Sequence, residues 1–172
     1  MKSILAGAIL GAALATAAVA QDESTNRVAV ETAWSVFVED DPQECWSVSS
    51  PTNTVNTRGG QVVSVRRGDI LLFVTFRPGS GANGEVSFTG GYPFADGSTV
   101  TLDIGGTEFE LFTDGEWAWP ASEAEDAQII AAMRRGAEAE LSARSERGTN
   151  TADTFSLFGF TAALEEAQSR CE

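Results

Sequence analysis

The sequence predicts a mainly β protein: an antiparallel β-sandwich of about eight strands, with two α-helices packed on it and one disulfide. Three observations predict this class. Apolar and polar residues alternate over several short stretches, and Gly-Gly or Asp-Gly pairs separate many of these stretches. Near the C-terminus the apolar spacing changes from two residues to about 3.6. Because 42% of the residues are hydrophobic and 21% are charged, the composition is that of a globular chain.

The first twenty residues have the layout of a secretory signal peptide. Lys2 provides the positive charge, an alanine-rich apolar run follows, and Ala18-Val19-Ala20 forms an A-x-A site that predicts cleavage after Ala20. The run is short and weakly apolar for the alternative, a spanning anchor. Cleavage leaves about 150 residues, enough for one domain of ordinary size. We therefore expect a signal peptide at 1–20, a flexible segment at 21–31 and a single domain at 32–172.

Eight stretches carry the alternation of strands. Residues 33–38 place Trp34, Val36 and Val38 on one face and Phe37 on the other. Residues 70–76 are apolar on both faces, which predicts a central strand. Arg67-Gly68 is expected to turn a hairpin, and residues 77–84 to form a flexible loop. The predicted strands are 33–38, 45–49, 61–66, 69–76, 85–89, 99–104, 107–112 and 117–119.

Two helices are predicted after the last of these strands. Ser122 and Glu125 form a capping box, Ile129, Ile130 and Met133 supply an apolar stripe, and a glycine follows, so a helix is expected at about 123–135. Residues 138–146 alternate as a further strand would, and residues 148–153 are expected to be a loop. The second helix is expected at about 156–169, capped by Asp153 or Ser156. Its apolar face would consist of Leu157, Phe160, Leu164, Ala167 and Cys171.

Only two cysteines are present, Cys45 and Cys171. In an exported protein a pair of cysteines predicts one disulfide, which would attach the C-terminal helix to an early strand. Two free thiols are the alternative. A zinc site is not indicated, because the chain has no histidine and two thiolates cannot complete a tetrahedral shell.

No catalytic, cofactor-binding or metal-binding residue is predicted. Ser156 has no histidine available as a base, and Lys2 would leave with the signal peptide, so this serine is interpreted as a helix cap. The acidic run Glu39-Asp40-Asp41 and the turn residues Asp96 and Asp114 are interpreted as solvated carboxylates. The net charge of −14 disfavours nucleic acid and anionic lipid as partners.

Two motifs have a binding interpretation beside a structural one. Arg67-Gly68-Asp69 spells an adhesion tripeptide at a predicted hairpin tip, where glycine and flanking charges are also ordinary turn residues. Trp117 and Trp119, two residues apart on a predicted strand, would share one face. If that face is exposed, the pair is a possible binding surface for a sugar or a peptide. If it is buried, the pair belongs to the core.

Several segments together resemble the invasion-associated locus B proteins of alphaproteobacteria. The resemblance is carried by Trp34, Cys45-Trp46-Ser47-Val48-Ser49, Gly91-Tyr92-Pro93, Ala118-Trp119 and the region from Asp153 to Cys171. It implies an exported, β-rich domain in the periplasm or at the outer membrane, and it supplies no catalytic residues. This chain has Phe37 near the position where founding-type members carry further cysteines, so it is more similar to a subgroup from free-living bacteria.

These features together predict an exported envelope protein, periplasmic or secreted, that is not an enzyme. It would need no cofactor and would act by binding an unidentified protein or envelope component. The alternative is a carbohydrate- or peptidoglycan-directed binding module, or a hydrolase that uses two carboxylates. An enzyme would bring carboxylates together in a cleft, whereas a binding protein would expose an aromatic or apolar patch.

Overall fold

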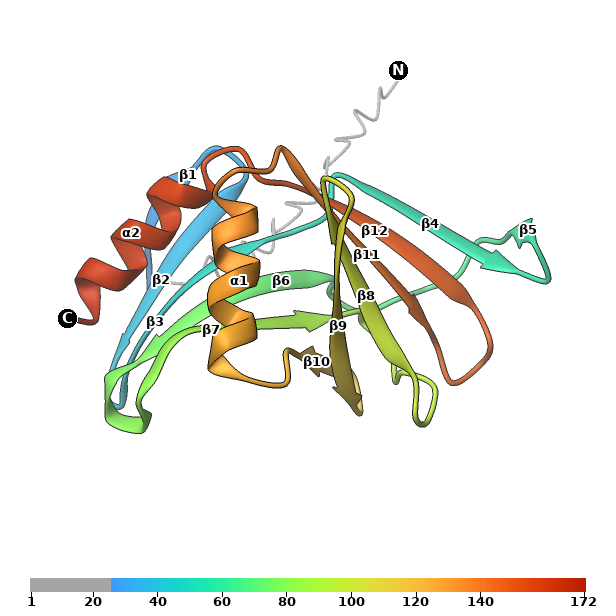
Figure 1. Ribbon diagram of the computed structural model, residues 1–172, viewed down its shortest axis with the longest axis horizontal. Coiled ribbons are helices and arrows are strands. Elements are labelled where there is room, and N and C mark those ends of the chain that lie inside the picture. The colour runs from blue at the N-terminus through green and yellow to red at the C-terminus, as the bar shows by residue number, and fades with distance from the viewer. Residues whose placement is uncertain (1–25) are drawn as a thin grey trace, which may run out of the picture.

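The computed structural model describes residues 26–172, so the predicted signal peptide and its cleavage after Ala20 lie outside the described residues. Twelve strands form one antiparallel sheet in the order β1-β2-β3-β6-β7-β10-β9-β8-β11-β12-β4-β5 (Figure 1). The first five strands in this order are β1 (Arg27–Glu31), β2 (Trp34–Asp40), β3 (Gln43–Ser49), β6 (Leu71–Arg77) and β7 (Ala82–Thr89). The next five are β10 (Trp117–Trp119), β9 (Thr107–Asp114), β8 (Thr99–Ile104), β11 (Glu138–Arg144) and β12 (Asn150–Ser156), followed by β4 (Asn53–Arg58) and β5 (Gln61–Val62).

The prediction of a mainly antiparallel β fold with two helices is confirmed, but the sandwich of about eight strands is wrong. The twelve strands belong to a single sheet whose two edges are β1 and β5, so the sheet is not closed. It encloses a core by curving, which brings the inner faces of its two halves together (Figure 1). Phe88 of β7 and Phe155 of β12 meet edge to face, with ring centroids 6.2 Å apart.

The alternating side chains of each half point into this shared core. One half contributes Trp34, Val36, Leu72, Val74, Val86 and Phe88, all fully buried. The other half contributes Val100, Leu102, Leu111, Leu141 and Phe155, which are also fully buried. The indole Nε1 of Trp34 donates a hydrogen bond to the carbonyl oxygen of Ser156 at 3.0 Å, which joins β2 to the end of β12.

The segment around Arg67-Gly68 is not a hairpin. β5 pairs with β4, whereas β6 pairs with β3 and β7, and residues 63–70 connect them without regular structure. The amide of Gly68 donates to the carbonyl oxygen of Gly91 at 2.9 Å. A Cβ atom on Gly91 would lie 2.6 Å from the backbone of Gly68, so this contact requires a glycine. Residues 77–84 are also more ordered than expected, because a short 3₁₀ turn at Pro78–Ser80 leads directly into β7.

Helix α1 (Glu123–Met133) matches its prediction closely. The hydroxyl of Ser122 accepts a hydrogen bond from the amide of Glu125, and Glu125 in turn accepts one from the amide of Ala121. Ile129 and Met133 are buried on the side that packs against β7. A Cβ atom on Gly136 would lie 2.7 Å from Ile104, so tight packing, rather than an unusual φ, requires this glycine after the helix.

Removal of this cap is expected to weaken α1 alone. Ser122→Ala deletes the acceptor of the Glu125 amide, which should lower the free energy of unfolding by about 1 kcal/mol. Chemical denaturation measures the change. Ser80→Ala, at an exposed hydroxyl that caps no α-helix, is the control and should alter stability by less than about 0.5 kcal/mol. Equal effects of the two changes would contradict the capping role.

Helix α2 (Phe160–Arg170) begins later than predicted, and its predicted caps are wrong. Gly159, in the left-handed region at φ 88°, is the N-cap residue, whereas Asp153 and Ser156 belong to β12. A Cβ atom on Gly159 would lie 2.0 Å from the carbonyl oxygen of Glu31, so only glycine allows the chain to pass this close to β1. β1 itself contradicts the expected flexibility of residues 27–31, because it pairs with β2.

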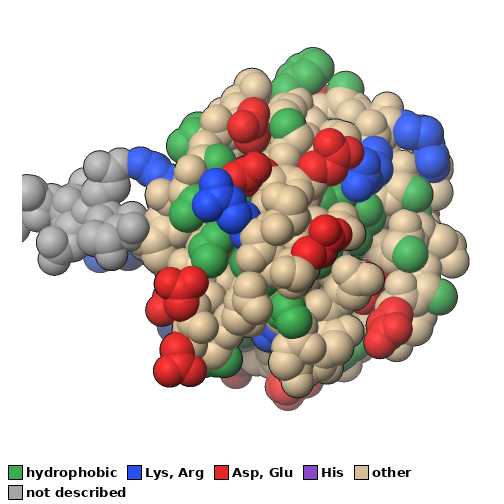
Figure 2. Space-filling view, turned by 90° about the vertical axis from the view of Figure 1, so that its left-hand side faces the viewer, with side chains coloured by type: hydrophobic (Ala, Val, Ile, Leu, Met, Phe, Trp, Pro, Cys, Tyr) green, Lys and Arg blue, Asp and Glu red, His purple; other side chains and the backbone are tan. Residues whose placement is uncertain are grey.

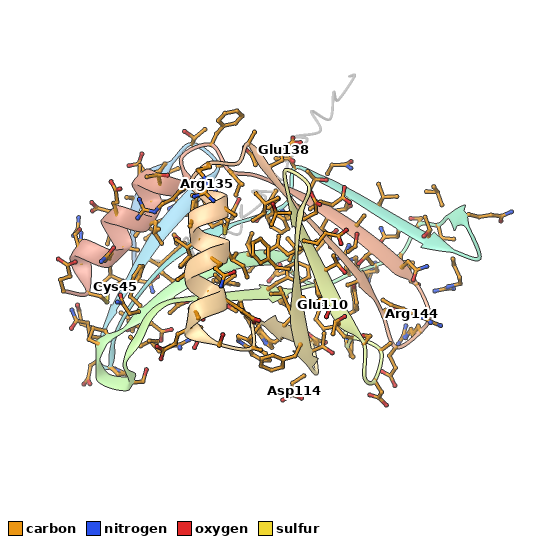
Figure 3. All side chains as sticks on the ribbon, viewed as in Figure 1. Cys45, Glu110, Asp114, Arg135, Glu138 and Arg144 are labelled. Carbon is orange, nitrogen blue, oxygen red and sulfur yellow. A yellow bond between two sulfur atoms is a disulfide. The ribbon has the colours of Figure 1, made fainter. Side chains whose placement is uncertain are left out.

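The predicted disulfide is confirmed. Cys45 and Cys171 are joined, 126 residues apart in sequence, and both are buried. Cys45 lies on β3 beside the C-terminal end of α2 (Figure 3). The buried face of α2 consists of Phe160, Ala163, Leu164 and Ala167, and it packs on β1, β2, β3 and β6. The disulfide therefore fixes the far end of a helix whose near end already contacts Trp34 through Phe160, at 4.9 Å between ring centroids.

Candidate functional site

Trp117 and Trp119 lie on the outer face of the sheet, opposite the core. Between them Ala118 points inward and is fully buried. The two indole rings lie nearly parallel, with centroids 6.3 Å apart and an interplanar angle of 21°. Trp117 is 39% exposed and Trp119 is partly exposed, so neither belongs to the core. Trp34, by contrast, is fully buried.

The two tryptophans belong to a larger group on the same outer face, which we call the aromatic face. Phe112 on β9 packs against Trp119 at 5.6 Å, and Phe73 on β6 packs against Trp117 at 5.7 Å between centroids. Farther along the sheet, Phe37 on β2 and Trp46 on β3 stack at 5.6 Å and 7°. The aromatic face therefore consists of Phe37, Trp46, Phe73, Phe112, Trp117 and Trp119.

Two shallow hollows lie along the aromatic face. One, of about 290 Å³, is lined by Trp46, Phe73, Trp117 and Trp119 together with polar groups. The other, of about 550 Å³, is lined by Phe37, Trp46 and Phe73. Because Trp46 and Phe73 line both hollows, the two form neighbouring parts of one surface. Aromatic rings beside polar groups in a shallow depression are suited to a flat ligand that is partly apolar and partly hydrogen-bonding.

One ion-pair cluster borders the smaller hollow. Arg77 donates to Glu44 at 2.8 Å and to Glu85 at 3.0 Å. Partial burial by itself would lower the pKa of Arg77, but the hydrogen bonds and charges of Glu85 and Glu44 outweigh this and raise the pKa above its usual value. The three side chains are therefore a fixed polar border with one cation between two anions.

The side of the molecule at which α2 lies is mixed in character. Figure 2 shows hydrophobic, acidic and basic side chains interspersed over the side of the molecule at which α2 lies. The large exposed hydrophobic residues outside the aromatic face are Val28, Val30, Val55, Val62 and Phe158. Single exposed apolar residues are normal on soluble surfaces, whereas adjoining ones mark a candidate binding site.

The adhesion tripeptide is not displayed as a recognition loop. The side chain of Arg67 is 6% exposed and forms a two-pronged ion pair with Asp153, whose side chain is fully buried. The two nitrogen–oxygen distances are 2.7 and 2.5 Å. Arg67 also donates to the carbonyl oxygen of Gly90 and lies over the ring of Tyr92. Arg67 therefore has a structural role that excludes its capture by a partner in this conformation.

Ser156 ends β12 and is not the cap of α2, whose N-cap residue is Gly159. Its hydroxyl accepts a hydrogen bond from the amide of Phe158 at 3.3 Å, and among residues 26–172 no carboxylate is hydrogen-bonded to it. The acidic run Glu39-Asp40-Asp41 is exposed where β2 turns into β3, and Asp96 is exposed in another turn and Asp114 at the end of β9. Figure 3 shows Glu110 and Asp114 on β9 and Glu138 on β11, well apart from one another. Within residues 26–172, no group of three or more His, Cys, Asp or Glu is placed to hold a metal ion.

Sequence reasoning identified two members of the aromatic face and missed four. Phe37, Trp46, Phe73 and Phe112 each occupy strand positions out of phase with the core residues. A face was assigned from the sequence only to Phe37, which the alternation placed opposite Trp34 and Val36. An aromatic residue at an outward position of several strands is the signal that would have predicted the full group.

Comparison with known proteins places this architecture in a family. The family model described as "Invasion associated locus B (IalB) protein" matches residues 34–168. The crystal structure of invasion associated protein B from Bartonella henselae is similar in fold, with a TM-score of 0.56 and 16% sequence identity over 82% of this chain and 95% of that chain. No curated protein matches the sequence. Over the described part of the chain, no helix has both the length and the hydrophobicity to cross a bilayer.

The family match covers most of the chain, from Trp34 on β2 into α2, and it agrees with the fold. The chain therefore belongs to the invasion associated locus B family.

Proposed function

We propose that this chain is an exported envelope protein that acts by binding, and that the aromatic face is its recognition surface. The observation that carries the proposal is the grouping of six aromatic side chains on the outer side of five strands. Four of them are in contact with one another, the other two stack as a pair, and two shared hollows join the groups. A soluble domain gains little stability from leaving such rings at its surface, whereas rigid, partly exposed aromatic residues are effective contacts in recognition. The twenty-residue N-terminal pattern and the buried disulfide support export.

A glycan is the second candidate ligand, and the smaller hollow favours it. The near-parallel indoles of Trp117 and Trp119 present two flat surfaces, on which pyranose rings could stack. Glu44, Glu85, Ser87 and Thr75 supply hydrogen-bonding groups along the same hollow. A protein ligand would use the rings as apolar anchors instead, and would extend into the larger hollow beside Phe37.

A carboxylate-dependent hydrolase is the less supported alternative. Such an enzyme needs one protonated carboxyl group as the acid and one ionised carboxylate as the base or nucleophile. Glu44 and Glu85 both line the smaller hollow, but each accepts a hydrogen bond from Arg77. With both carboxylates engaged by the same cation, neither is placed to deliver a proton to a leaving group.

The proposal predicts that Trp117→Ala/Trp119→Ala abolishes retention of the native ligand. The mature protein, immobilised, would be incubated with a detergent extract of the native envelope and, separately, with purified peptidoglycan. Loss of two aromatic rings that a ligand covers in the complex lowers the binding free energy by about 2 kcal/mol or more, so retention should fall at least about tenfold. Circular dichroism and thermal melting would verify that the variant remains folded.

Phe158→Ala is the matched control, because it removes a 65% exposed aromatic ring away from the aromatic face. Retention by the wild type and by Phe158→Ala, with loss in the double tryptophan variant, supports the proposal. Retention on peptidoglycan selects the glycan candidate, and retention of a protein from the extract selects the protein candidate. Equal retention by all three proteins contradicts the aromatic face as the recognition surface.

A further inference from the structure

A cavity of about 420 Å³, separate from the two hollows of the aromatic face, lies near the open edge of the sheet. Its lining is rich in positively charged side chains. Four arginines line it: Arg58, Arg66, Arg67 and Arg147. The carboxylates that line it are Glu116 and Glu146. The lining therefore has more cations than anions, although the whole chain carries a net charge of −14. A local excess of positive charge in so acidic a protein is unlike the rest of its surface.

Three of the four arginines of this cavity form no ion pair with a carboxylate among the described residues. Arg77, Arg134 and Arg170, elsewhere in the chain, each form an ion pair with a glutamate. In the cavity, Arg67 alone is paired, with Asp153 behind it. Within the described part of the chain, Arg58, Arg66 and Arg147 have no carboxylate within ion-pair distance.

Two side chains give the cavity a fixed wall. Arg58 donates to the hydroxyl of buried Thr149 at 2.7 Å, which directs its guanidinium toward the cavity side of β4. Arg67 is immobilised by Asp153 and stacks over Tyr92 at 5.0 Å. Burial raises the pKa of Tyr92 above its usual value, although Thr151 and Arg67 act against this, so its hydroxyl remains a hydrogen-bond donor at neutral pH.

We infer that this cavity binds the phosphate group of a ligand. Guanidinium groups donate paired hydrogen bonds that match the geometry of phosphate oxygens. The three arginines without a carboxylate partner, Arg58, Arg66 and Arg147, suit an anion of more than one charge, whereas Arg67 is held by Asp153 and forms only the wall. The hydroxyl group of Thr149, which accepts from Arg58, can donate its own hydrogen beside them, whereas the hydroxyl of Tyr92 already shares a hydrogen bond with Thr151 at 2.5 Å. The inference goes beyond the proposed function and does not depend on it, because none of the aromatic-face residues lines this cavity.

The test titrates inorganic phosphate into the ¹⁵N-labelled mature protein at constant ionic strength, held with sodium chloride. We expect saturable shifts in the amides of Gly91, Tyr92, Arg147 and Thr149. Arg58→Gln/Arg147→Gln, which leaves the structural Arg67 intact, should weaken binding at least about tenfold. Arg135→Gln, an exposed arginine on another part of the surface with no ion pair among the described residues, should leave the affinity unchanged.

Vesicles distinguish a soluble phosphate compound from a lipid headgroup. Cosedimentation with phosphatidylcholine vesicles containing phosphatidylglycerol, lost in the double variant, would assign a lipid source. Phosphate binding without cosedimentation would assign a soluble source, which we expect because the net charge of −14 opposes approach to an anionic membrane. Either of these two outcomes supports phosphate binding in the cavity. An absence of saturable shifts in these amides, or equal affinity in the wild type and the double variant, overturns the inference.

Discussion

Asp153→Ala is expected to lower the free energy of unfolding by about 3–5 kcal/mol, the largest loss we predict for a single substitution outside the apolar core. The carboxylate of Asp153 is fully buried and accepts hydrogen bonds from both terminal nitrogens of Arg67. Removing it leaves a buried guanidinium without a counter-ion, which costs much more than the loss of an exposed ion pair. For a domain of this size, the melting temperature should fall by roughly 10 °C.

The position of the pair explains why one substitution has so large an effect. Arg67 lies in the irregular segment 63–70, and Asp153 lies on β12, 86 residues away in the chain. Arg67 also donates to Gly90 and to Asn56 on β4, so a single guanidinium holds together three separate parts of the chain. Loss of the pair should therefore release the segment 63–70 as well as weaken β12.

Urea denaturation of Asp153→Ala, with Asp114→Ala as the control, measures the effect. Asp114 is exposed, and its removal should change stability by less than about 0.5 kcal/mol. The double variant Arg67→Met/Asp153→Leu removes both charges and should be more stable than Asp153→Ala alone, because no unpaired buried charge remains. A cost below about 1 kcal/mol for Asp153→Ala would show that Arg67 reaches solvent when its partner is absent.

The same ion pair shows where sequence reasoning reached its limit. Asp153 follows a polar loop and precedes an amphipathic stretch, which is the local context of a helix N-cap. Its true partner is set by the pairing of β12 with β4 and by the path of residues 63–70, neither of which has a local signal. β4 and β12 were missed for a related reason. Their inward positions include Asn56, Thr151 and Asp153, so polar residues occupy positions at which alternation predicts apolar ones.

Elements with local signals were predicted well. The capping box at Ser122 and the glycine after the apolar stripe located α1 to within two residues of its observed end. The alternation of β2, β3, β8 and β9 reports directly which residues face the core. The aromatic face could be predicted from the sequence only in part. The spacing of Trp117 and Trp119 put them on one side of a strand, but contact of Trp117 with Phe73 requires the pairing of β10 with β7, which joins distant parts of the chain.

Loss of the disulfide between Cys45 and Cys171 is expected to lower the free energy of unfolding by about 2–5 kcal/mol. The bond closes a loop with a sequence separation of 126, so its removal enlarges the number of conformations open to the unfolded chain. In the native protein the effect is local. Phe160, Ala163 and Leu164 still hold the first turns of α2 on the sheet, whereas the end near Ala167 loses its covalent link to β3.

Cys45→Ala/Cys171→Ala, compared with the oxidised wild type by thermal melting and by amide hydrogen exchange, tests both parts of this expectation. Exchange should accelerate at residues 166–171 and remain slow in β8 and β11, which do not pair with β3, the strand that carries Cys45. Thiol labelling of the denatured, unreduced wild type should find no free cysteine. If reduction leaves the melting temperature unchanged, the packing of α2 on β1, β2 and β3 is sufficient by itself. The bond would then protect the chain end without contributing to the stability of the fold.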